Sequence, residues 1–201
     1  MSKKRQVIIS VLALLSLTLV TTGVSYSLLD YDPSGVNYKS RLIYNYSNYQ
    51  NTSEFSISNV VPMSDQDGKN LSGDGNVFEF SVSGSFSEGE FQPYQVIVTK
   101  SDNSTLSFDE VKLYVTEVVG GKEYPVLDTS DQSGNVFKGS QLKESSVLPI
   151  GSSRTVHNDI AYNMYNHNFK RVFRLRMWVS EDTKQFQGKN FSVNVSIVTE
   201  D

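Results

Sequence analysis

The sequence contains no cysteine, and this absence sets the first limit on how the protein can be stabilised. Disulfide bonds are excluded, so a stable domain must depend on a packed apolar core. The chain has 201 residues, which is enough for one ordinary domain with a substantial core. Domains exported by eukaryotic cells usually contain disulfides, so their absence fits an exported protein of Gram-positive bacteria, if the chain is exported at all.

Positive charge is scarce once the N-terminus is left out. Lys3, Lys4 and Arg5 are three of the 18 basic residues, which leaves 15 basic against 22 acidic residues, a net charge of −7. A domain with this balance has no electrostatic reason to bind nucleic acid or anionic lipid. The nearest approach to a basic cluster lies at 170–176, where alternation predicts Arg174 and Arg176 on the outward face of a strand.

Catalytic and metal-binding signatures are also missing. The two histidines, His157 and His167, lie ten residues apart, and no H-E-x-x-H pattern for zinc occurs. The sequence has no cysteine and no G-x-S-x-G motif, so it contains no recognisable nucleophile for covalent catalysis. We therefore expect no enzyme activity, no cofactor and no metal site. A hydrolase site assembled only by the fold stays open as an alternative.

The acidic, glycine-rich segment Asp65–Asn76 is the candidate for a cation site. Calcium takes six to eight oxygen ligands, and this segment contains several carboxylates and amides. Read from Asn70, the pattern N-x-S-x-D-G places Gly75 at the sixth position of an EF-hand-like loop. The twelfth position is Ser81, where such a loop requires a glutamate. The pattern therefore favours a solvated turn over a calcium site.

The N-terminus contains the clearest targeting signal. Its basic start is followed by Val7–Val20, fourteen residues without a charge, and then by small residues at Ser25 and Ser27. This pattern predicts a secretory signal peptide that signal peptidase cleaves after Ser27. The uncharged stretch Gln6–Leu29 also has the ~20 residues that a membrane-spanning helix needs, so an uncleaved anchor stays open. In both cases the rest of the chain is exported.

Beyond residue 30 the hydrophobic pattern has a period of two rather than 3.6. Because successive side chains on a strand point to opposite faces, each alternating segment predicts a strand with one buried and one wet face. Clear alternation predicts strands at 78–83, 111–116, 173–180 and 191–198, and weaker signals predict strands at 41–46, 54–60, 94–99 and 123–127.

Turn-rich segments such as Gly120-Gly121 separate these strands. About eight antiparallel strands with short connections predict an all-β antiparallel sandwich, specifically a jelly roll, preceded by one hydrophobic N-terminal helix. The stretch Arg154–Lys170 lacks a clean period, and we expect a long loop there with a helical turn around Ile160–Tyr165. The expected parts are a signal peptide or anchor at 1–29, a linker or donor segment at 30–38, and the sandwich domain at 39–201.

Aromatic residues cluster in a way that suits recognition of protein or sugar. Trp178 falls on the polar phase of its predicted strand. A covering loop or a neighbouring sheet would explain such aromatics equally well. The clustered tyrosines are Tyr38, Tyr44, Tyr46, Tyr49, Tyr162 and Tyr165.

Two segments resemble a known family. The leader ends in Gly23–Ser27 and is followed directly by a β domain, and Phe173–Asp182 with Phe191–Val195 looks like a closing hairpin. Both resemble exported Gram-positive surface and biofilm-matrix proteins of the camelysin and TasA type. The resemblance covers the leader and roughly the last thirty residues, and it implies a jelly-roll sandwich at the cell surface.

In fibre-forming members of that family, the resemblance implies polymerisation by strand donation. The new N-terminal segment of one subunit would complete the sheet of the next, because an open sheet edge has N–H and C=O groups without partners. The donor here would be Leu28–Tyr38, with Leu28, Leu29 and Tyr31 as its apolar anchors. Camelysin is classed as a metallopeptidase, an activity that we do not expect in a chain without a zinc motif.

We therefore expect an exported structural or adhesive protein of the cell surface or extracellular space. It would act through protein–protein contacts, with other surface proteins or with itself as a fibre subunit. The alternative is a surface binding module for glycan or peptide, held by an uncleaved leader and recognising its ligand through the tyrosines and Trp178. The membrane would be contacted through the N-terminal segment, and nucleic acid is not an expected partner.

Overall fold

The structure, a computed structural model, describes residues 41–46, 53–58, 61–86, 89–127, 136–149, 151–162 and 168–199. All of these residues belong to the unit Lys39–Asp201. Within them, no helix is both long and apolar enough to span a membrane. The expected leader and donor segment lie outside the described residues, and so do Ser25, Ser27, Leu28, Leu29 and Tyr31.

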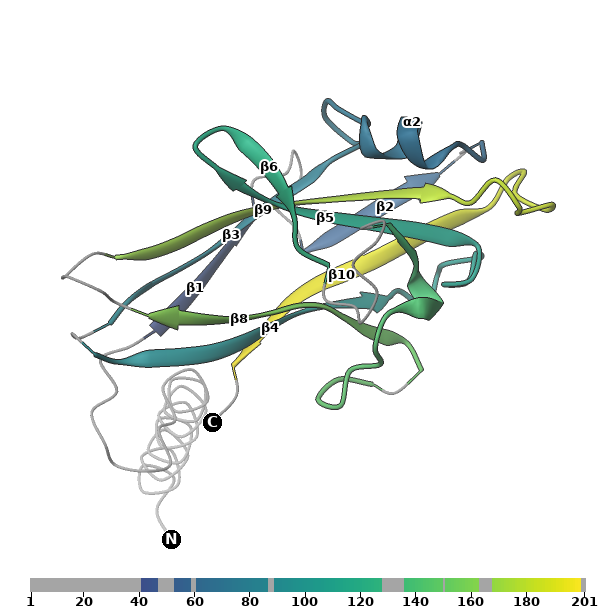
Figure 1. Cartoon of the computed structure of the whole chain (residues 1–201). Helices are drawn as coiled ribbons and strands as arrows, with labels where there is room; N and C mark the ends of the chain where they lie inside the picture. The colour runs from purple at the N-terminus through teal and green to yellow at the C-terminus, as the bar shows by residue number, and fades with distance from the viewer. Residues whose placement is uncertain are drawn as a thin grey trace, which may run out of the picture. The chain divides into compact units, whose positions relative to one another are not determined.

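Two antiparallel sheets make up the described part of the chain (Figure 1). The first sheet has the order β1 (Arg41–Tyr46), β3 (Phe78–Ser85), β9 (Phe169–Val179), β5 (Val111–Val119) and β6 (Lys122–Pro125), with β7 (Phe137–Lys138) paired to β5. The second sheet has the order β2 (Glu54–Ser58), β10 (Asn190–Thr199), β4 (Phe91–Lys100) and β8 (Ser153–Tyr162). The predicted all-β antiparallel sandwich is confirmed.

The chain alternates between the two sheets as it proceeds. Strands β1, β3, β5 and β9 belong to the first sheet, and β2, β4, β8 and β10 belong to the second. Each pass from one sheet to the other brings a new apolar face into the space between them. The core is therefore built from residues that lie far apart in the sequence.

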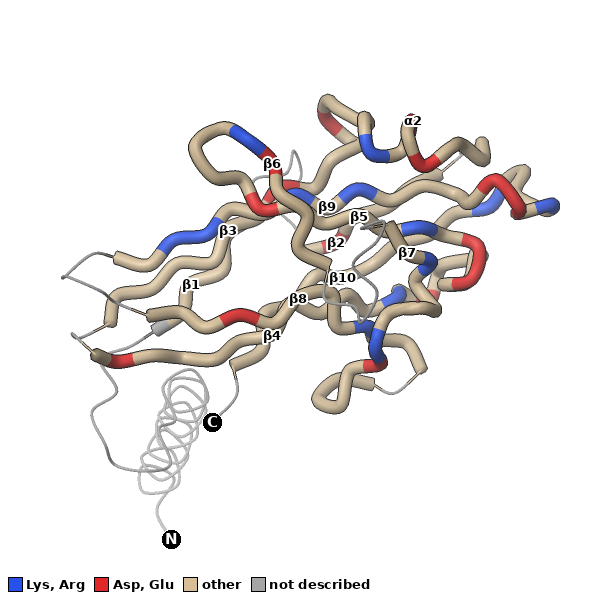
Figure 2. The backbone as a smooth tube through the Cα atoms, viewed as in Figure 1, with Lys and Arg blue, Asp and Glu red and all other residues tan. Residues whose placement is uncertain are grey.

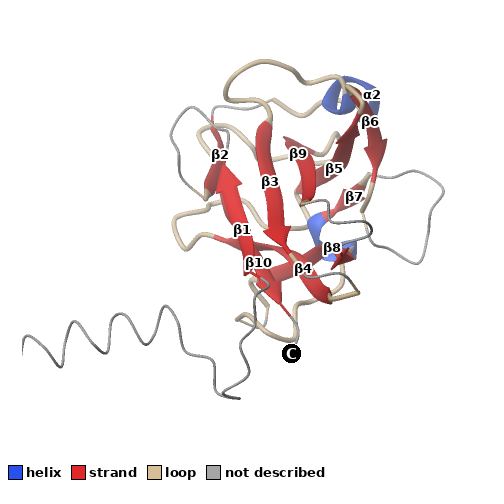
Figure 3. Cartoon of the chain, turned by 90° about the vertical axis from the view of Figure 1, so that its left-hand side faces the viewer, coloured by secondary structure: helices blue, strands red, loops and turns tan. Residues whose placement is uncertain are grey.

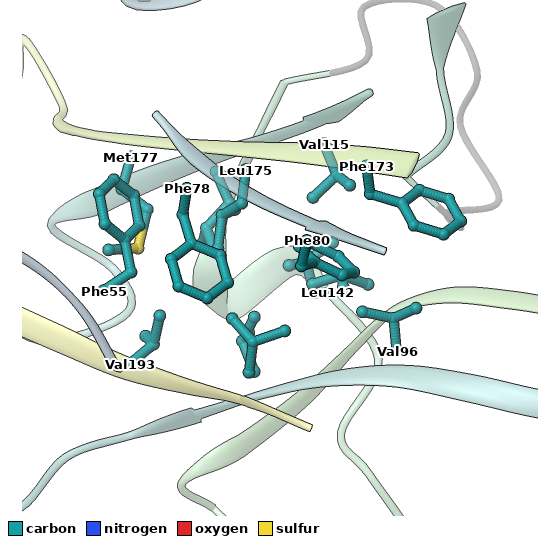
Figure 4. Close-up of a cluster of buried hydrophobic side chains, with 14 of the residues drawn as sticks. Phe55, Phe78, Phe80, Val96, Val115, Leu142, Phe173, Leu175, Met177 and Val193 are labelled. Carbon is teal, nitrogen blue, oxygen red and sulfur yellow. The ribbon is translucent and has the colours of Figure 1, made fainter. Parts of the chain in front are cut away.

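Aromatic side chains fill much of that space. Phe55 of β2 and Phe78 of β3 lie next to each other between the two sheets (Figure 4). Their rings stack with centroids 5.7 Å apart. Phe80 of β3 stacks on Phe173 of β9 at 5.3 Å, and Val96 of β4 is completely buried. Each large apolar side chain removed from water in this way contributes roughly 1.5–3 kcal/mol to stability. The period-two pattern of the sequence thus becomes the contact between the sheets.

All eight predicted strands are present, with ends that differ by a few residues. The expected loop over Arg154–Lys170 is wrong, because residues 153–162 form β8. The register between β4 and β8 shifts between Val96 and Ile97, which marks a β-bulge. The bulge allows both Val156 and Ala161, five residues apart, to lie in the core. A simple alternation was therefore absent from the sequence, although the segment is a strand.

The short helix α2 (Asp65–Lys69) covers the outer side of the first sheet (Figure 3). Trp178 points outward from β9, as predicted, yet is only 1% exposed because α2 lies over it. A Cβ atom built on Gly68 would stand 2.2 Å from the indole ring, so the helix backbone rests directly on that ring. An ion pair of 2.6 Å between Lys112 and Asp65 fastens the helix to β5.

An ionic network holds the hairpin of β5 and β6 against the same outer face. Glu123 of β6 accepts hydrogen bonds from Arg176 at 2.6 and 3.0 Å, from Arg174 at 2.7 Å and from Thr116 at 2.7 Å. These contacts, above all the one from Arg176, hold the pKa of the Glu123 carboxyl at about 2. Arg176 also donates to the Leu71 carbonyl at 2.8 Å, which ties the segment after α2 to the network.

Replacing Gly68 by alanine is expected to destabilise the domain, because the new methyl group would occupy the space of the Trp178 ring. Overpacking of this kind costs about 1–3 kcal/mol. The matched control is Gln66→Ala, in the same helix at an exposed position. Urea unfolding followed by tryptophan fluorescence measures both. Equal midpoints for G68A and Q66A would contradict the packing of α2 on Trp178.

The variant Glu123→Gln is expected to lose about 1–3 kcal/mol of stability at neutral pH, because two arginines lose an ionised partner. The folded-state pKa lies below the ordinary value of 4.5, so this stabilisation is present above pH 4.5 and is lost as pH falls towards 2. Urea unfolding at several pH values should show wild type and E123Q converging in that window. The control is Glu181→Gln, at an exposed position. A difference of constant size from pH 7 to pH 2.5 would contradict the network.

Candidate interaction surface

The outward side of the second sheet differs in chemistry from the rest of the domain. On β4, β8 and β10, three of its four strands, which the structure describes in full, no outward position is occupied by a charged residue, whereas Glu54 of β2 points outward beside Asn194. We call this surface the uncharged face. It consists of Phe91, Pro93, Gln95, Ile97 and Thr99 of β4, Ser153, Thr155, Asn158, Ile160 and Tyr162 of β8, and Ser192, Asn194, Ser196 and Val198 of β10.

Four neighbouring residues make one end of the uncharged face apolar. Phe91 lies opposite Tyr162, and Pro93 lies opposite Ile160, so the four form two adjacent cross-strand pairs. Phe91 is 68% exposed, Ile160 47% and Tyr162 42%. We call this set the apolar patch. It lies where β4 begins and β8 ends, at the left-hand end of the sheets in Figure 1.

The other end of the uncharged face is not accessible. Ile97, Ser153 and Thr155 are all buried, although they point outward from their strands. Residues 143–145 run beside β8 there, and the Thr155 amide donates to the Lys143 carbonyl at 2.9 Å. The accessible part of the uncharged face is therefore the apolar patch with the residues beside it.

Charged side chains gather on the first sheet instead. Its outward positions include Glu79, Lys112, Lys170, Arg174 and Arg176. Figure 2 shows blue and red segments along β9 and β6, whereas β4 and β8 are tan along most of their length. The two outer faces of the sandwich thus present different chemistry to a partner. The outward positions of the first sheet include many charged residues, and those of β4, β8 and β10 include none.

A polar cluster lies between the sheets near the same end. The Tyr94 hydroxyl donates to Asp159 at 3.0 Å, and His157 Nε2 lies 4.0 Å from the same carboxylate. Arg171 reaches across from β9, with its Nε 3.8 Å from Asp159 and its Nη1 hydrogen-bonded to Glu117. All five side chains point inward, so one guanidinium links carboxylates from both sheets.

The electrostatics of this cluster fit a structural link better than a catalytic site. Burial, helped by the Asp159 carboxylate, raises the pKa of the Tyr94 phenol above its ordinary value, so Tyr94 stays protonated. Burial opposes the charge of Arg171, but the hydrogen bond to Glu117 raises the pKa of the guanidinium. A permanently charged arginine between the two carboxylates leaves little room for general acid–base work.

Sequence reasoning missed this cluster, although it contains one of the two histidines. The five residues lie on β4, β5, β8 and β9, and they meet only because these strands pair within each sheet and the two sheets pack together. His157 was expected in a loop, and the β8 bulge instead turns it towards Phe173, with ring centroids 5.5 Å apart. His167 lies outside the described residues.

Two of the three carboxylates of the candidate calcium segment, Asp65 and Asp67, are engaged in other contacts. Asp65 pairs with Lys112, and the Ser64 hydroxyl donates to Asp67 at 2.7 Å while accepting from the Asp67 amide. In the part of the chain that the structure describes, no group of three or more His, Cys, Asp or Glu side chains could hold a metal ion. The segment predicted as a turn contains the one-turn helix α2, whose role is to cover Trp178.

The aromatic residues expected to recognise a ligand differ in their exposure. Trp178 is buried, and the Tyr44 ring packs edge-on against Phe80 at 5.7 Å. Tyr162 is exposed, next to Phe91, which the sequence had not marked. Tyr38, Tyr49 and Tyr165 lie outside the described residues.

Comparison with known proteins identifies no relative of this chain. No protein-family model matches the chain, and neither a curated protein nor a solved structure matches it. The resemblance to camelysin and TasA-type proteins therefore stays a prediction from the leader and the C-terminal hairpin.

Calcium is expected to leave the thermal stability of the protein unchanged, because Asp65 and Asp67 already have partners. A ligand that binds only the folded state raises Tm. Melting curves of the full chain in EDTA and in millimolar calcium should therefore coincide within about 1 °C, with magnesium as the matched control. A selective rise in Tm with calcium, abolished by Asp65→Asn, would restore the cation site.

Proposed function

We propose that the protein is an exported structural or adhesive component of the bacterial cell surface that acts through protein–protein contacts. The observation that supports this most is the apolar patch of Phe91, Pro93, Ile160 and Tyr162 within a face that has no charge. Exposed aromatic and aliphatic side chains that lie side by side, with polar residues around them, mark sites of interaction. Aromatic residues are enriched, and charged residues depleted, in the centres of protein interfaces.

The strand order supports the finer form of the fold, a jelly roll. In that fold eight strands form two four-stranded sheets through two Greek keys. Here β2-β10-β4-β8 forms one such sheet and β3-β9-β5-β6 the other, with β1 added beside β3. The hydropathy of Val7–Val20 supports the hydrophobic N-terminal helix that precedes the sandwich.

A fibre subunit is the most specific version of the proposal. Signal peptidase would cleave after Ser27, and Leu28–Tyr38 would become a free N-terminal segment able to add to a sheet edge of another copy. Each sheet offers edge strands for this purpose, since β1 and β6 end the order of the first sheet, and β2 and β8 end that of the second. Leu28, Leu29 and Tyr31 would anchor the added strand.

The second candidate is a membrane-anchored surface module that binds glycan or peptide. Trp178 cannot serve it while α2 covers the indole. The exposed rings of Phe91 and Tyr162, with the neighbouring amide of Asn158, favour it instead, because an aromatic face beside uncharged polar groups suits a neutral sugar. This candidate and the first one predict different binding partners for the same patch.

The test is to express the full chain in a Gram-positive host and to separate cytoplasm, membrane, wall and medium. We expect the protein outside the cytoplasm, in complexes of high molecular mass on native gels and by size-exclusion chromatography. The double variant Phe91→Ser with Tyr162→Ser should reduce the share of protein in these complexes by at least half, since the apolar contact that packs their subunits is lost. The matched control is Val119→Ser with Tyr124→Ser, two residues of similar exposure on the hairpin of β5 and β6.

Three results decide between the candidates. Protein confined to the cytoplasm, or complexes unchanged by the patch variant, would refute the first proposal. Monomeric wild-type protein that binds wall polysaccharide, with binding lost in the patch variant, would favour the second candidate. Complexes lost in the patch variant alone would support the first.

A further inference from the structure

We infer that the partner of the apolar patch is the same patch on a second copy of this chain, in a lateral contact between neighbouring molecules. This inference rests on the proposed function, because it names the partner in the protein–protein contact. The contact would place the uncharged faces of two copies against each other. It differs from strand donation, which uses a sheet edge and the N-terminal segment.

The lack of charged residues makes this face the most favourable one for self-association. The chain after the basic leader has a net charge of −7, so two copies repel each other over most approaches. Like charges brought together in an interface cost several kcal/mol. On β4, β8 and β10 no outward residue is charged, so the two patches themselves oppose no like charges. Glu90, directly before Phe91 in the chain, is exposed and charged, so it must stay at the rim of the contact. A charged partner would gain no attraction from the same surface.

The arrangement of the four apolar side chains also suits a symmetric contact. Phe91 and Tyr162 form one row across β4 and β8, and Pro93 and Ile160 form the next row. In a two-fold contact the same residues meet from both sides, so the surface must be complementary to itself. A patch of rings and aliphatic groups meets that condition, because apolar contact has no direction and no sign.

Joining two β8 edges is a less suitable contact. Charged residues that point inward from an edge strand are one of the features that discourage edge-to-edge pairing. On β8, His157 and Asp159 point inward and belong to the cluster with Arg171. The exposed Ile160 and Tyr162 point outward instead. The outward face of β8 is therefore better suited to self-contact than its edge.

The size of the patch predicts a weak contact. Four side chains on two strands cover much less than the ~800 Å² per partner that a stable complex usually buries. Copies in dilute solution would therefore stay mostly apart. Copies that are already held side by side, in a fibre or at a surface, have an effective concentration in the millimolar range, which is enough to form such a contact. The patch thus serves to pack neighbouring molecules.

The absence of cysteine allows a direct test with single introduced thiols. Ile160→Cys places a thiol within the apolar patch, and Ser85→Cys places one on the outer face of the first sheet, at an exposed position. Each variant is made in the full chain, and cells or purified complexes are treated with a short bis-maleimide. We expect the I160C chain to form covalent homodimers at least ten times faster than the S85C chain. Adding F91S and Y162S to I160C should reduce the rate to that of S85C.

Equal rates for I160C and S85C in complexes that depend on the patch would overturn the inference and leave the proposed function standing, because the patch would then hold another protein. Mass spectrometry of the cross-linked band distinguishes a homodimer from a complex with another protein. If the patch binds a second copy, the band contains peptides of this chain alone. No complexes and no cross-links in any variant would refute both. Patch-dependent binding to lipid vesicles or to wall polysaccharide, without homodimers, would also overturn self-contact.

Discussion

The apolar contact between the two sheets is the interaction on which the rest of the structure depends. No disulfide can substitute for it, because the chain has no cysteine. The contact is made by alternate residues of strands from both sheets, among them Phe55, Phe78, Phe80 and Phe173. Since alternate residues point inward, the remaining residues of every strand are left to define the outer faces. The core thereby determines which residues can meet a partner.

The outer faces are used in different ways. On the first sheet the arginines of β9 bind Glu123, and α2 covers Trp178, so the charged and aromatic residues there satisfy each other within the chain. On the second sheet the uncharged face leaves Phe91, Ile160 and Tyr162 exposed, and the outward residues beside them on β4, β8 and β10 carry no charge. The helix α2 and the β5–β6 hairpin thus cover part of the first face, whereas the apolar patch of the second face remains open to another molecule. This difference is the physical basis of the proposed function.

The part of the fold that follows from strict alternation could be predicted from the sequence. Strands β3, β5, β9 and β10 were evident, because their inward residues recur at every second position. Strand β8 was missed because a bulge shifts its phase, and two later features were missed with it. The apolar patch needs Ile160 and Tyr162 beside Phe91, and the polar cluster needs Asp159 beside Tyr94. The covering of Trp178 could not be predicted either, because it depends on how closely the Gly68 backbone approaches the ring.

The central claim is that the protein meets its partner through the apolar patch, and hydroxyl-radical footprinting tests it most directly. Labelling of Phe91 and Tyr162 is compared between dilute monomer and protein on the surface of intact cells, with Tyr124 as an internal reference of similar exposure. The account predicts strong labelling of all three rings in the monomer, and loss of labelling of Phe91 and Tyr162 but not Tyr124 on cells. Equal labelling of Phe91 and Tyr162 in both states would contradict it.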